Sequence, residues 1–359
     1  MKKDKRIVFT GGGTAGHVIV NLALIPYFQQ AGWGIDYIGS KNGIERQLIE
    51  ELNDVTYHPI STGKLRRYMS IENIKDPFKV LKGVWDAWRI IGKIKPHILF
   101  SKGGFVSVPV VAAARMRRVP TIIHESDMTP GLANKLATKF AEKVLTTFPE
   151  TLDYLPAEKA IHIGAVIRED LFKGDRNVAY RWTELSKGKP VLLIMGGSSG
   201  SANINRVVRD NLASLLKKYH IIHICGSGNI DENLHMAGYR QYEYVNEELK
   251  HILAMTDYVI SRAGANAIFE FLALHIPMLL IPLPLSVSRG DQIDNAKSFV
   301  KSGFAHILME EDISTASFEA AIDILVQHAP EMKERMKQEN TEKSREQVIH
   351  LIESMAKTK

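Results

Sequence analysis

Two stretches of this chain repeat one plan, in which an apolar strand leads through a glycine-rich loop into a helix. The first is VFTGGGTAGH at residues 8–17 and the second is LIMGGSSGSA at 193–202, so that Gly11 and Gly196 stand 185 residues apart. A loop of this kind places backbone amides at the start of a helix, where they can bind an anion. The restart predicts two similar α/β halves, each of which opens with such a loop.

The rest of the chain agrees with this plan. Short β-branched runs alternate with longer segments of helical period, a pattern typical of βα units and parallel sheets. At 359 residues the chain exceeds the usual size of a single core. We predict a first domain over 1–163, a second over 164–340 with a hinge between 163 and 190, and a C-terminal helix within 341–359 that packs back on the first domain. Ligands of open α/β sheets bind at the carboxyl ends of the strands, so we expect a cleft between the two halves.

The loop at 11–16 fits the GxGxxG pattern of dinucleotide-binding proteins and the first six positions of the triphosphate loop GxxxxGK[ST]. A triphosphate loop continues with lysine and then serine or threonine, but this chain has His17 and Val18 there. A dinucleotide-binding domain has an acid at the end of its second strand, where this chain has Ser40 and Lys41. The residues that carry either chemistry are missing, which disfavours both interpretations, and we expect no cofactor.

His17 follows the first glycine loop and falls in the first turn of the predicted helix. The positive end of a helix dipole lowers the pKa of an imidazole and favours its neutral form, which can accept a proton. His17 is therefore a candidate general base. The plainer alternative is a tight strand-to-helix turn that binds no ligand.

The chain has a net charge of +6, and all of this excess falls within residues 61–95, which hold nine Lys and Arg against three acids. Asp76 and Pro77 predict a helix start there. Apolar residues then recur at spacings of three and four, namely Phe78, Leu81, Trp85 and Trp88. Such a helix either packs on its own sheet or binds an anionic membrane surface. No nucleic-acid-binding module accompanies the basic residues, so we expect no nucleic acid partner.

The N-terminus lacks the apolar stretch of a signal peptide, and no run of 18 apolar residues occurs. The single cysteine, Cys225, has no partner for a disulfide within the chain. The cysteine count indicates either a protein of a reducing compartment or simply one without disulfides, and the missing signal peptide and apolar span favour the cytosol.

Seven motifs occur in the order GGGTAGH, SKGGFVSVPVVAAA, HESDMTPGLANK, GAVIRED, MGGSSGS, SRAGANAIFEF and SRGDQIDNA. Between about residue 6 and residue 340 the chain thereby resembles the bacterial UDP-N-acetylglucosamine:lipid I N-acetylglucosaminyltransferases. The resemblance implies two Rossmann-like domains in the GT-B arrangement. It also implies transfer of GlcNAc, with inversion and release of UDP, from UDP-GlcNAc to the 4-hydroxyl of N-acetylmuramic acid in undecaprenyl-linked lipid I, which forms lipid II for peptidoglycan.

The resemblance assigns the donor mainly to the second domain and the acceptor to the first. The residues implied to bind substrate are Thr14, Gly16, Asn134, Arg168, Ser198, Val245, Glu270 and Gln292, with Asp291 less certain. Of these, Ser198 and Arg168 would meet the diphosphate of the donor, Glu270 its ribose hydroxyls and Val245 its uracil. Gln292 and Asn134 would contact GlcNAc, and the amides of the 11–16 loop would meet the diphosphate of the acceptor.

His17 is the favoured catalytic base, and Glu125 is the alternative. A helix N-terminus, a serine hydroxyl and an arginine can balance the charge of leaving UDP, so we expect no metal. Because the polyprenyl acceptor stays in the bilayer, we expect reversible, peripheral attachment to the cytoplasmic face of the plasma membrane through part of residues 64–95. Two other functions remain open, a UDP-GlcNAc 2-epimerase-like isomerase and a non-catalytic UDP-sugar-binding regulator.

Overall fold

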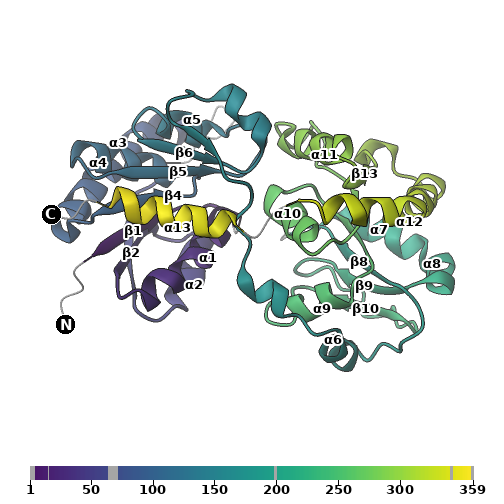
Figure 1. Ribbon diagram of the computed structural model, residues 1–359. Coiled ribbons are helices and arrows are strands. Elements are labelled where there is room, and N and C mark those ends of the chain that lie inside the picture. The colour runs from purple at the N-terminus through teal and green to yellow at the C-terminus, as the bar shows by residue number, and fades with distance from the viewer. Residues whose placement is uncertain (1–4, 15, 64–71, 198–199, 340–342, 357–359) are drawn as a thin grey trace. The chain divides into compact units, whose positions relative to one another are not determined.

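The computed structural model describes residues 5–14, 16–63, 72–197, 200–339 and 343–356, and over 72–77 it describes the backbone alone. Contacts divide the chain into two compact units. Unit 1 comprises residues 1–166 together with 343–359, and unit 2 comprises residues 167–342. Each is built on a parallel sheet flanked by helices, which confirms the predicted α/β fold class with two parallel sheets (Figure 1).

Unit 1 contains a seven-stranded sheet in the order β3-β2-β1-β4-β5-β6-β7, and all neighbouring strands are parallel. The chain order reverses between β1 and β4, and ligands of open α/β sheets bind at such a switch point. The strands are β1 (Arg6–Thr10), β2 (Gly34–Ser40), β3 (Val55–Ile60), β4 (Ile98–Ser101), β5 (Thr121–Glu125), β6 (Lys143–Thr146) and β7 (Ala160–His162).

A hydrophobic core lies on each face of this sheet. Successive strand residues point to opposite faces and so enter different cores. Ile7 and Phe9 enter one hydrophobic core, whereas Val8 enters the other. The helices of unit 1 are α1 (Gly16–Gln30), α2 (Ile44–Glu50), α3 (Glu72–Ile94), α4 (Ser107–Met116), α5 (Leu132–Ala137), the 3₁₀ helix η1 (Pro149–Tyr154) and α13 (Ser344–Met355).

The C-terminal helix α13 belongs to unit 1 and lies beside α1, as Figure 1 shows in yellow. Val348 and Ile352 are buried in the core that α1 shares with the sheet. At the surface, the hydroxyl of Tyr27 donates to Glu353 at 3.2 Å and Nε of Arg345 donates to the carbonyl of Ala23 at 3.1 Å. The chain therefore returns from unit 2 to complete the first unit.

The helix α3 differs from the prediction at its start. Asp76 and Pro77 do not begin the helix, which already starts at Glu72. Proline removes one amide hydrogen bond and crowds the carbonyl four residues earlier, and here that carbonyl belongs to Asn73 in the first turn, where a distortion costs least. The helix start predicted from Asp76 and Pro77 was therefore wrong by one helical turn.

The apolar face that the sequence predicts for α3 divides between core and surface. Ala87 and Ile91 are buried against the sheet. Trp88 is half-buried, and the guanidinium of Arg117 from the end of α4 stacks on its ring at 3.5 Å from the centroid. Phe78, Leu81 and Trp85, earlier in the helix, are exposed. Within the described residues, no helix combines the length and apolar character that a membrane span needs.

Unit 2 contains a six-stranded parallel sheet in the order β10-β9-β8-β11-β12-β13, with its switch point between β8 and β11. The strands are β8 (Val191–Met195), β9 (His220–Ile224), β10 (Tyr239–Tyr242), β11 (Tyr258–Ser261), β12 (Met278–Leu280) and β13 (Ala305–Ile307). The helices are η2 (Glu169–Lys173), α6 (Arg176–Thr183), α7 (Ala202–Asp210), α8 (Leu212–Lys218), α9 (Leu249–Met255), α10 (Ala265–Ala273), α11 (Asp291–Lys301), η3 (Glu310–Asp312) and α12 (Thr315–Met336).

Candidate functional site

The glycine loop of unit 1 turns the chain from β1 into α1 at the switch point of the sheet. Gly11 and Gly13 have φ angles of +156° and +89°, and a Cβ on Gly11 would collide with the carbonyl oxygen of His17. Only glycine avoids both the strain and the collision. The amide of Gly12 donates to the carbonyl of Gly103 at 3.3 Å, so the loop after β4 supports this turn.

Glu45, in the first turn of α2, holds the same loop from the side of β2. Its Oε2 accepts the amide of Gly13 at 3.1 Å, and its Oε1 accepts the amide of Ser40 at 3.0 Å and the Ser40 hydroxyl at 2.5 Å. The Glu45 carboxylate thus takes the position of an anion at one of the amides that we expected to meet a phosphate. Sequence reasoning missed this residue, although an acid in the first turn of the helix after β2 was a usable signal.

His17 lies half-buried in the first turn of α1. Its Nδ1 is 3.0 Å from the carbonyl oxygen of Gly12 and 3.1 Å from the hydroxyl of Thr14. A carbonyl can only accept, so we assign the proton to Nδ1, which leaves the lone pair on Nε2. Burial and, second, the charge of Lys102 lower the pKa of His17 to about 4. The imidazole is therefore neutral at pH 7, and its Nε2 can accept a proton.

Lys102, directly after β4, brings a buried positive charge to the same strand ends. Its ammonium donates to the hydroxyl of Ser126, which directly follows β5. Burial lowers the pKa of Lys102, whereas the charges of Glu125 and Asp127 act to raise it. This lysine was not among the residues predicted from the sequence. Its place after a buried strand was the available signal, because the carboxyl ends of parallel strands meet at one edge of the sheet.

Glu125 ends β5, and its carboxylate holds the loop that follows. Oε1 accepts the amide of Asp127 at 3.1 Å, while Oε2 accepts the amide of Gly131 at 2.9 Å and Nδ2 of Asn134 at 3.0 Å. Both oxygens are thus engaged in orienting the loop and Asn134. Within the described residues, the buried Oδ1 of Asn134 has no hydrogen-bond partner and can accept from a ligand. This arrangement favours His17 over Glu125 as the proton acceptor.

A pocket of about 910 Å³ opens beside these residues in unit 1. Its size is that of a small-molecule site. Thr14 and His17 line it, and Gly16 begins α1 next to them. The lining also includes Gly12, Gly13, Lys41, Glu45, Lys79, Lys82 and Phe105. Lysines from α3 and the β2–α2 loop thus share one pocket with the candidate base.

The glycine loop of unit 2 joins β8 to α7 at the other switch point. Ser198 and Ser199 lie outside the described residues, so the structure does not place the predicted diphosphate contact of Ser198. Gly197 and Gly200 have φ angles of +88° and +73°, and a Cβ on Gly200 would collide with the carbonyl of Cys225. The loop ends at Ser201, the N-cap of α7.

Arg168 and Glu270 come together in unit 2, although they are 102 residues apart in the chain. Nε of Arg168 lies 3.7 Å from Oε1 of Glu270, whose side chain is 12% exposed. Arg168 also approaches Asp170, with Nη1 at 3.9 Å from Oδ2. Burial raises the pKa of Glu270 to about 7, although the charge of Arg168 opposes this shift. The carboxylate is therefore held in a poorly hydrated place beside one cation.

The other predicted donor residues lie at the carboxyl-end loops of the same sheet. Val245 lies in the loop between β10 and α9, and Gln292 lies in the first turn of α11. Oε1 of Gln292 accepts the amide of Leu283 at 3.2 Å, which orients its side chain. Asp291 instead pairs with Nε of Arg289 at 3.7 Å. Among the described residues, no three side chains of His, Cys, Asp or Glu are arranged to hold a metal ion.

The two halves of the chain match the two domains of one protein family. Residues 7–146 match the glycosyltransferase family 28 N-terminal domain, and residues 191–351 match the family's C-terminal domain. The chain belongs to glycosyltransferase family 28. The two matches cover most of its length, and the first contains strands β1 to β6 apart from Arg6 at the start of β1, while the second contains β8 to β13.

Relatives of this family 28 chain extend over its whole length. The UDP-N-acetylglucosamine--N-acetylmuramyl-(pentapeptide) pyrophosphoryl-undecaprenol N-acetylglucosamine transferase of Oceanobacillus iheyensis is 61% identical over 357 residues, 99% of this chain and 100% of the relative. The crystal structure of Acinetobacter baumannii MurG aligns with a TM-score of 0.77 and 25% identity, covering 98% of this chain and 99% of that one.

The fold alone does not separate a transferase from an epimerase. The UDP-GlcNAc 2-epimerase from Neisseria meningitidis, bound to UDP-GlcNAc, aligns with a TM-score of 0.65 over 97% of this chain and 99% of that one. Its identity is only 12%, so this likeness concerns the fold. Family membership and the full-length identity to a transferase favour glycosyl transfer.

Proposed function

We propose that this chain transfers GlcNAc from UDP-GlcNAc to the 4-hydroxyl of N-acetylmuramic acid in lipid I, with inversion at the anomeric carbon and release of UDP. The observation that carries the proposal is the 61% identity, over 99% of this chain, to a transferase named as an N-acetylglucosamine transferase acting on N-acetylmuramyl-(pentapeptide) pyrophosphoryl-undecaprenol. The two glycine loops at the switch points also support it. Lipid I and the leaving group UDP each contain a diphosphate, and a glycine loop at the start of a helix can bind one.

For the donor, unit 2 supplies groups matched to each part of UDP-GlcNAc. Glu270 accepts hydrogen bonds from the two ribose hydroxyls, and the backbone at Val245 reads the uracil edge. Ser198 and the amides at the start of α7 meet the diphosphate, with Arg168 beside them. As UDP leaves, negative charge grows on the diphosphate, and a helix N-terminus with a guanidinium stabilises it. Gln292 contacts the hydroxyls of GlcNAc.

For the acceptor, unit 1 supplies the base and an anion-binding pocket. The 4-hydroxyl attacks the anomeric carbon while Nε2 of His17 takes its proton, and the bond from that carbon to the UDP oxygen breaks. The diphosphate of lipid I lies in the pocket near Lys79 and Lys82, where the amide of Gly13 exchanges its bond with Glu45 for one with phosphate. Asn134, also on unit 1, contacts the GlcNAc of the donor through its Oδ1, which has no hydrogen-bond partner among the described residues.

The raised pKa of Glu270 predicts a pH dependence of donor binding. Only the ionised carboxylate accepts from both ribose hydroxyls, so affinity falls as pH falls through about 7. We expect the Kd of UDP-GlcNAc at pH 6 to be about tenfold higher than at pH 8. Calorimetry with UDP-GlcNAc measures this directly, because its diphosphate does not titrate in this range. In the Glu270→Gln variant the dependence should vanish, and an unchanged dependence there would assign it to another group.

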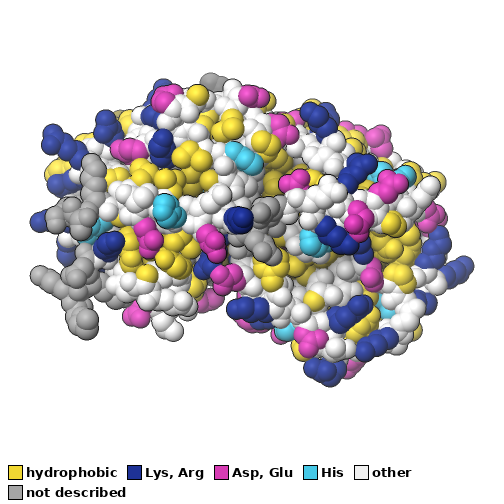
Figure 2. All heavy atoms as spheres, in the orientation of Figure 1, with side chains coloured by type: hydrophobic (Ala, Val, Ile, Leu, Met, Phe, Trp, Pro, Cys, Tyr) yellow, Lys and Arg dark blue, Asp and Glu magenta, His cyan; other side chains and the backbone are white. Residues whose placement is uncertain are grey.

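The outer face of α3 has the surface expected of a membrane-binding helix. Phe78, Leu81 and Trp85 are 73%, 66% and 58% exposed. They follow one another at spacings of three and four and therefore form one stripe, which the exposed Lys79 and Lys82 flank. Figure 2 shows Lys and Arg side chains gathered at the margin of unit 1 where Figure 1 places α3 and α4.

Such a stripe binds a bilayer by inserting apolar side chains while its lysines attract anionic headgroups. The polyprenyl chain of lipid I keeps the acceptor sugar at the membrane surface, so the enzyme acts there. We therefore assign the chain to the cytoplasmic face of the plasma membrane as a peripheral protein, attached through α3. Residues 64–71 of the predicted segment lie outside the described residues.

Vesicle flotation tests the attachment. Lys79→Glu with Lys82→Glu should lower binding to phosphatidylglycerol vesicles at least about tenfold, since each basic residue near an anionic surface contributes about 1 kcal/mol. Phe78→Ser with Trp85→Ser should also release the protein. The matched control reverses Lys217 and Lys301, exposed lysines of unit 2. Equal binding by all these variants would refute a role for α3.

Incubation with labelled UDP-GlcNAc, with and without lipid I, distinguishes the three candidate functions. UDP release that requires lipid I supports transfer. Formation of N-acetylmannosamine without lipid I would support the epimerase, and binding without any product would support a regulator.

A further inference from the structure

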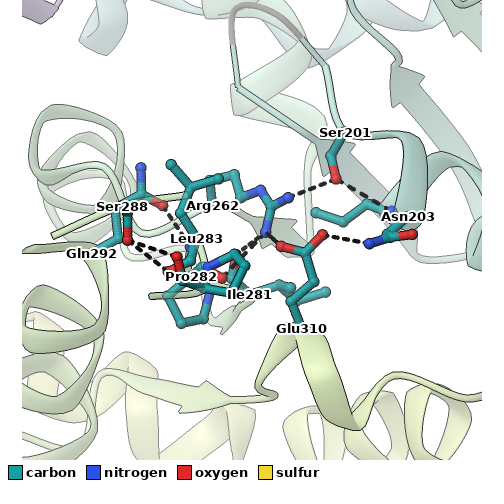
Figure 3. A network of polar contacts seen from close by, with 11 residues as sticks. Ser201, Asn203, Arg262, Ile281, Pro282, Leu283, Ser288, Gln292 and Glu310 are labelled. Atoms are coloured by element: carbon teal, nitrogen blue, oxygen red, sulfur yellow. Dashed lines mark hydrogen bonds and ion pairs between the residues drawn. The ribbon is translucent and has the colours of Figure 1, made fainter. Parts of the chain in front are cut away.

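The buried guanidinium of Arg262 joins the segment after β11 to three other segments of unit 2, which contain Ser201, Ile281–Pro282 and Glu310 (Figure 3). Arg262 directly follows β11. Its Nη1 donates to the carbonyls of Ile281 and Pro282 at 3.1 and 3.2 Å and to Oε2 of Glu310 at 2.6 Å. Its Nη2 donates to the hydroxyl of Ser201 at 2.7 Å. The rigid fork of arginine can hold several acceptors in fixed directions, and lysine cannot.

The bond to Ser201 fixes the end of the glycine loop between β8 and α7, the loop that we assign to the diphosphate of the donor. Ser201 is the N-cap of α7, and its Oγ accepts the amide of Ile204 at 3.4 Å as well as the bond from Arg262. The aliphatic part of the Arg262 side chain packs against the loop. Its Cγ lies 3.9 Å from the position that a Cβ on Gly197 would take. The position of the amides that begin α7 thus depends on this side chain.

The bonds to Ile281 and Pro282 fix a second part of the donor site. The next residue, Leu283, donates its amide to Oε1 of Gln292 and accepts from the hydroxyl of Ser288 at 3.2 Å (Figure 3). Gln292 is the residue that we assign to the GlcNAc hydroxyls. Arg262 therefore joins the loop for the diphosphate to the segment that orients the group for the sugar.

Glu310 completes the connection from η3. Its Oε2 pairs with Arg262, and its Oε1 accepts from Nδ2 of Asn203 on α7 at 2.9 Å. Both charged side chains are 9% exposed. Neutralised by this carboxylate and committed to protein acceptors through both Nη atoms, the guanidinium serves the arrangement of the loops.

We propose that Arg262 is a positioning residue for the donor, which holds the diphosphate-binding turn of α7 and the Gln292 segment at the separation that UDP-GlcNAc requires. The inference rests on the proposed function. Our proposal binds uridine through Glu270 and Val245. Among the described residues neither of these two shares a hydrogen bond or ion pair with Arg262, so loss of Arg262 should weaken diphosphate binding and spare the nucleoside.

The test compares uridine and UDP binding by calorimetry, with uridine measured by displacement where it is weak. Arg262→Gln removes the bond from the guanidinium to the Ser201 hydroxyl, which holds the amides at the start of α7. It should raise the Kd of UDP at least about tenfold, because a hydrogen bond to a charged group contributes this much or more. The Kd of uridine should change less than about twofold. Arg262→Lys should not restore UDP binding. Equal losses for both ligands, or no loss for UDP, would overturn the proposal.

Ser201→Gly keeps the test decisive if Arg262→Gln does not fold, since glycine is tolerated at an N-cap and the Arg262–Glu310 pair stays intact. On its own it should raise the Kd of UDP selectively. Where Arg262→Gln does fold, adding it to Ser201→Gly should contribute less than in the wild-type background. Additive losses would contradict action through Ser201. Arg240→Gln is the matched control, because this arginine of β10 is also held by main-chain carbonyls.

The wild-type protein separates the two levels of inference. If it binds UDP no more tightly than uridine, the proposed donor site itself is wrong. If it prefers UDP and Arg262→Gln keeps that preference, only the role of Arg262 is wrong.

Discussion

Replacing His17 with alanine is expected to lower kcat by about 10²- to 10⁴-fold at saturating donor and acceptor, the usual contribution of a general base. The neutral imidazole has its Nδ1 committed to the carbonyl of Gly12, so Nε2 is free to take the proton of the attacking hydroxyl. The Kd of UDP-GlcNAc should stay within about twofold, because the proposed donor contacts, apart from Asn134, lie on unit 2. Steady-state kinetics with lipid I and calorimetry with the donor measure the two quantities.

His350→Ala is the matched control, because His350 is an exposed histidine on α13 of the same unit. It should leave kcat unchanged. Thr14→Val removes the hydroxyl beside Nδ1 but keeps the bond to Gly12, so a smaller loss is expected. A normal kcat in His17→Ala would remove this residue from catalysis and return attention to Glu125.

Replacing Glu270 with alanine is expected to raise the Kd of UDP-GlcNAc by about 10²- to 10⁴-fold, because two hydrogen bonds to a charged group are lost. At saturating donor, kcat should change much less, since the carboxylate lies away from the reacting carbon in our proposal. Calorimetry and donor-dependent kinetics test this split. An unchanged Kd would refute the role of Glu270 in binding the ribose.

Ionisation of the Glu270 carboxylate favours donor binding in our proposal, but it should lower the stability of the folded protein. Folding raises its pKa from 4.5 to about 7, so ionising it costs stability, and this cost grows as pH rises through that window. Glu270→Gln should therefore gain more thermal stability relative to the wild type at pH 8 than at pH 5. Comparison of the two melting temperatures at both pH values measures the effect.

The fold was predictable because its signals are local. Buried runs such as 6–10 and 121–125 have the pattern of strands, and the two glycine loops mark the two switch points. The missing lysine after Gly16 was enough to disfavour a triphosphate site. The start of α3 was misplaced because the Asp-Pro signal marks one favourable helix start but does not exclude an earlier one, and the helix begins at Glu72.

The polar connections of the site were not predictable, because they join residues far apart in sequence. Glu45 reaches Gly13 from 32 positions away, and Arg262 reaches Ser201 from 61. Neither residue forms a motif with its partner. Only the meeting of strand ends in the folded sheet brings such pairs together, so a sequence pattern identifies the loops but not what holds them.

The most direct measurement is the anomeric configuration of the sugar that the full chain transfers from UDP-GlcNAc to lipid I in vesicles, determined by NMR on the purified product. Direct attack with His17 as base predicts one GlcNAc joined to the 4-hydroxyl of N-acetylmuramic acid for each UDP released, with the configuration inverted relative to the donor. Retention of configuration, or UDP release without a GlcNAc-containing lipid product, would contradict it.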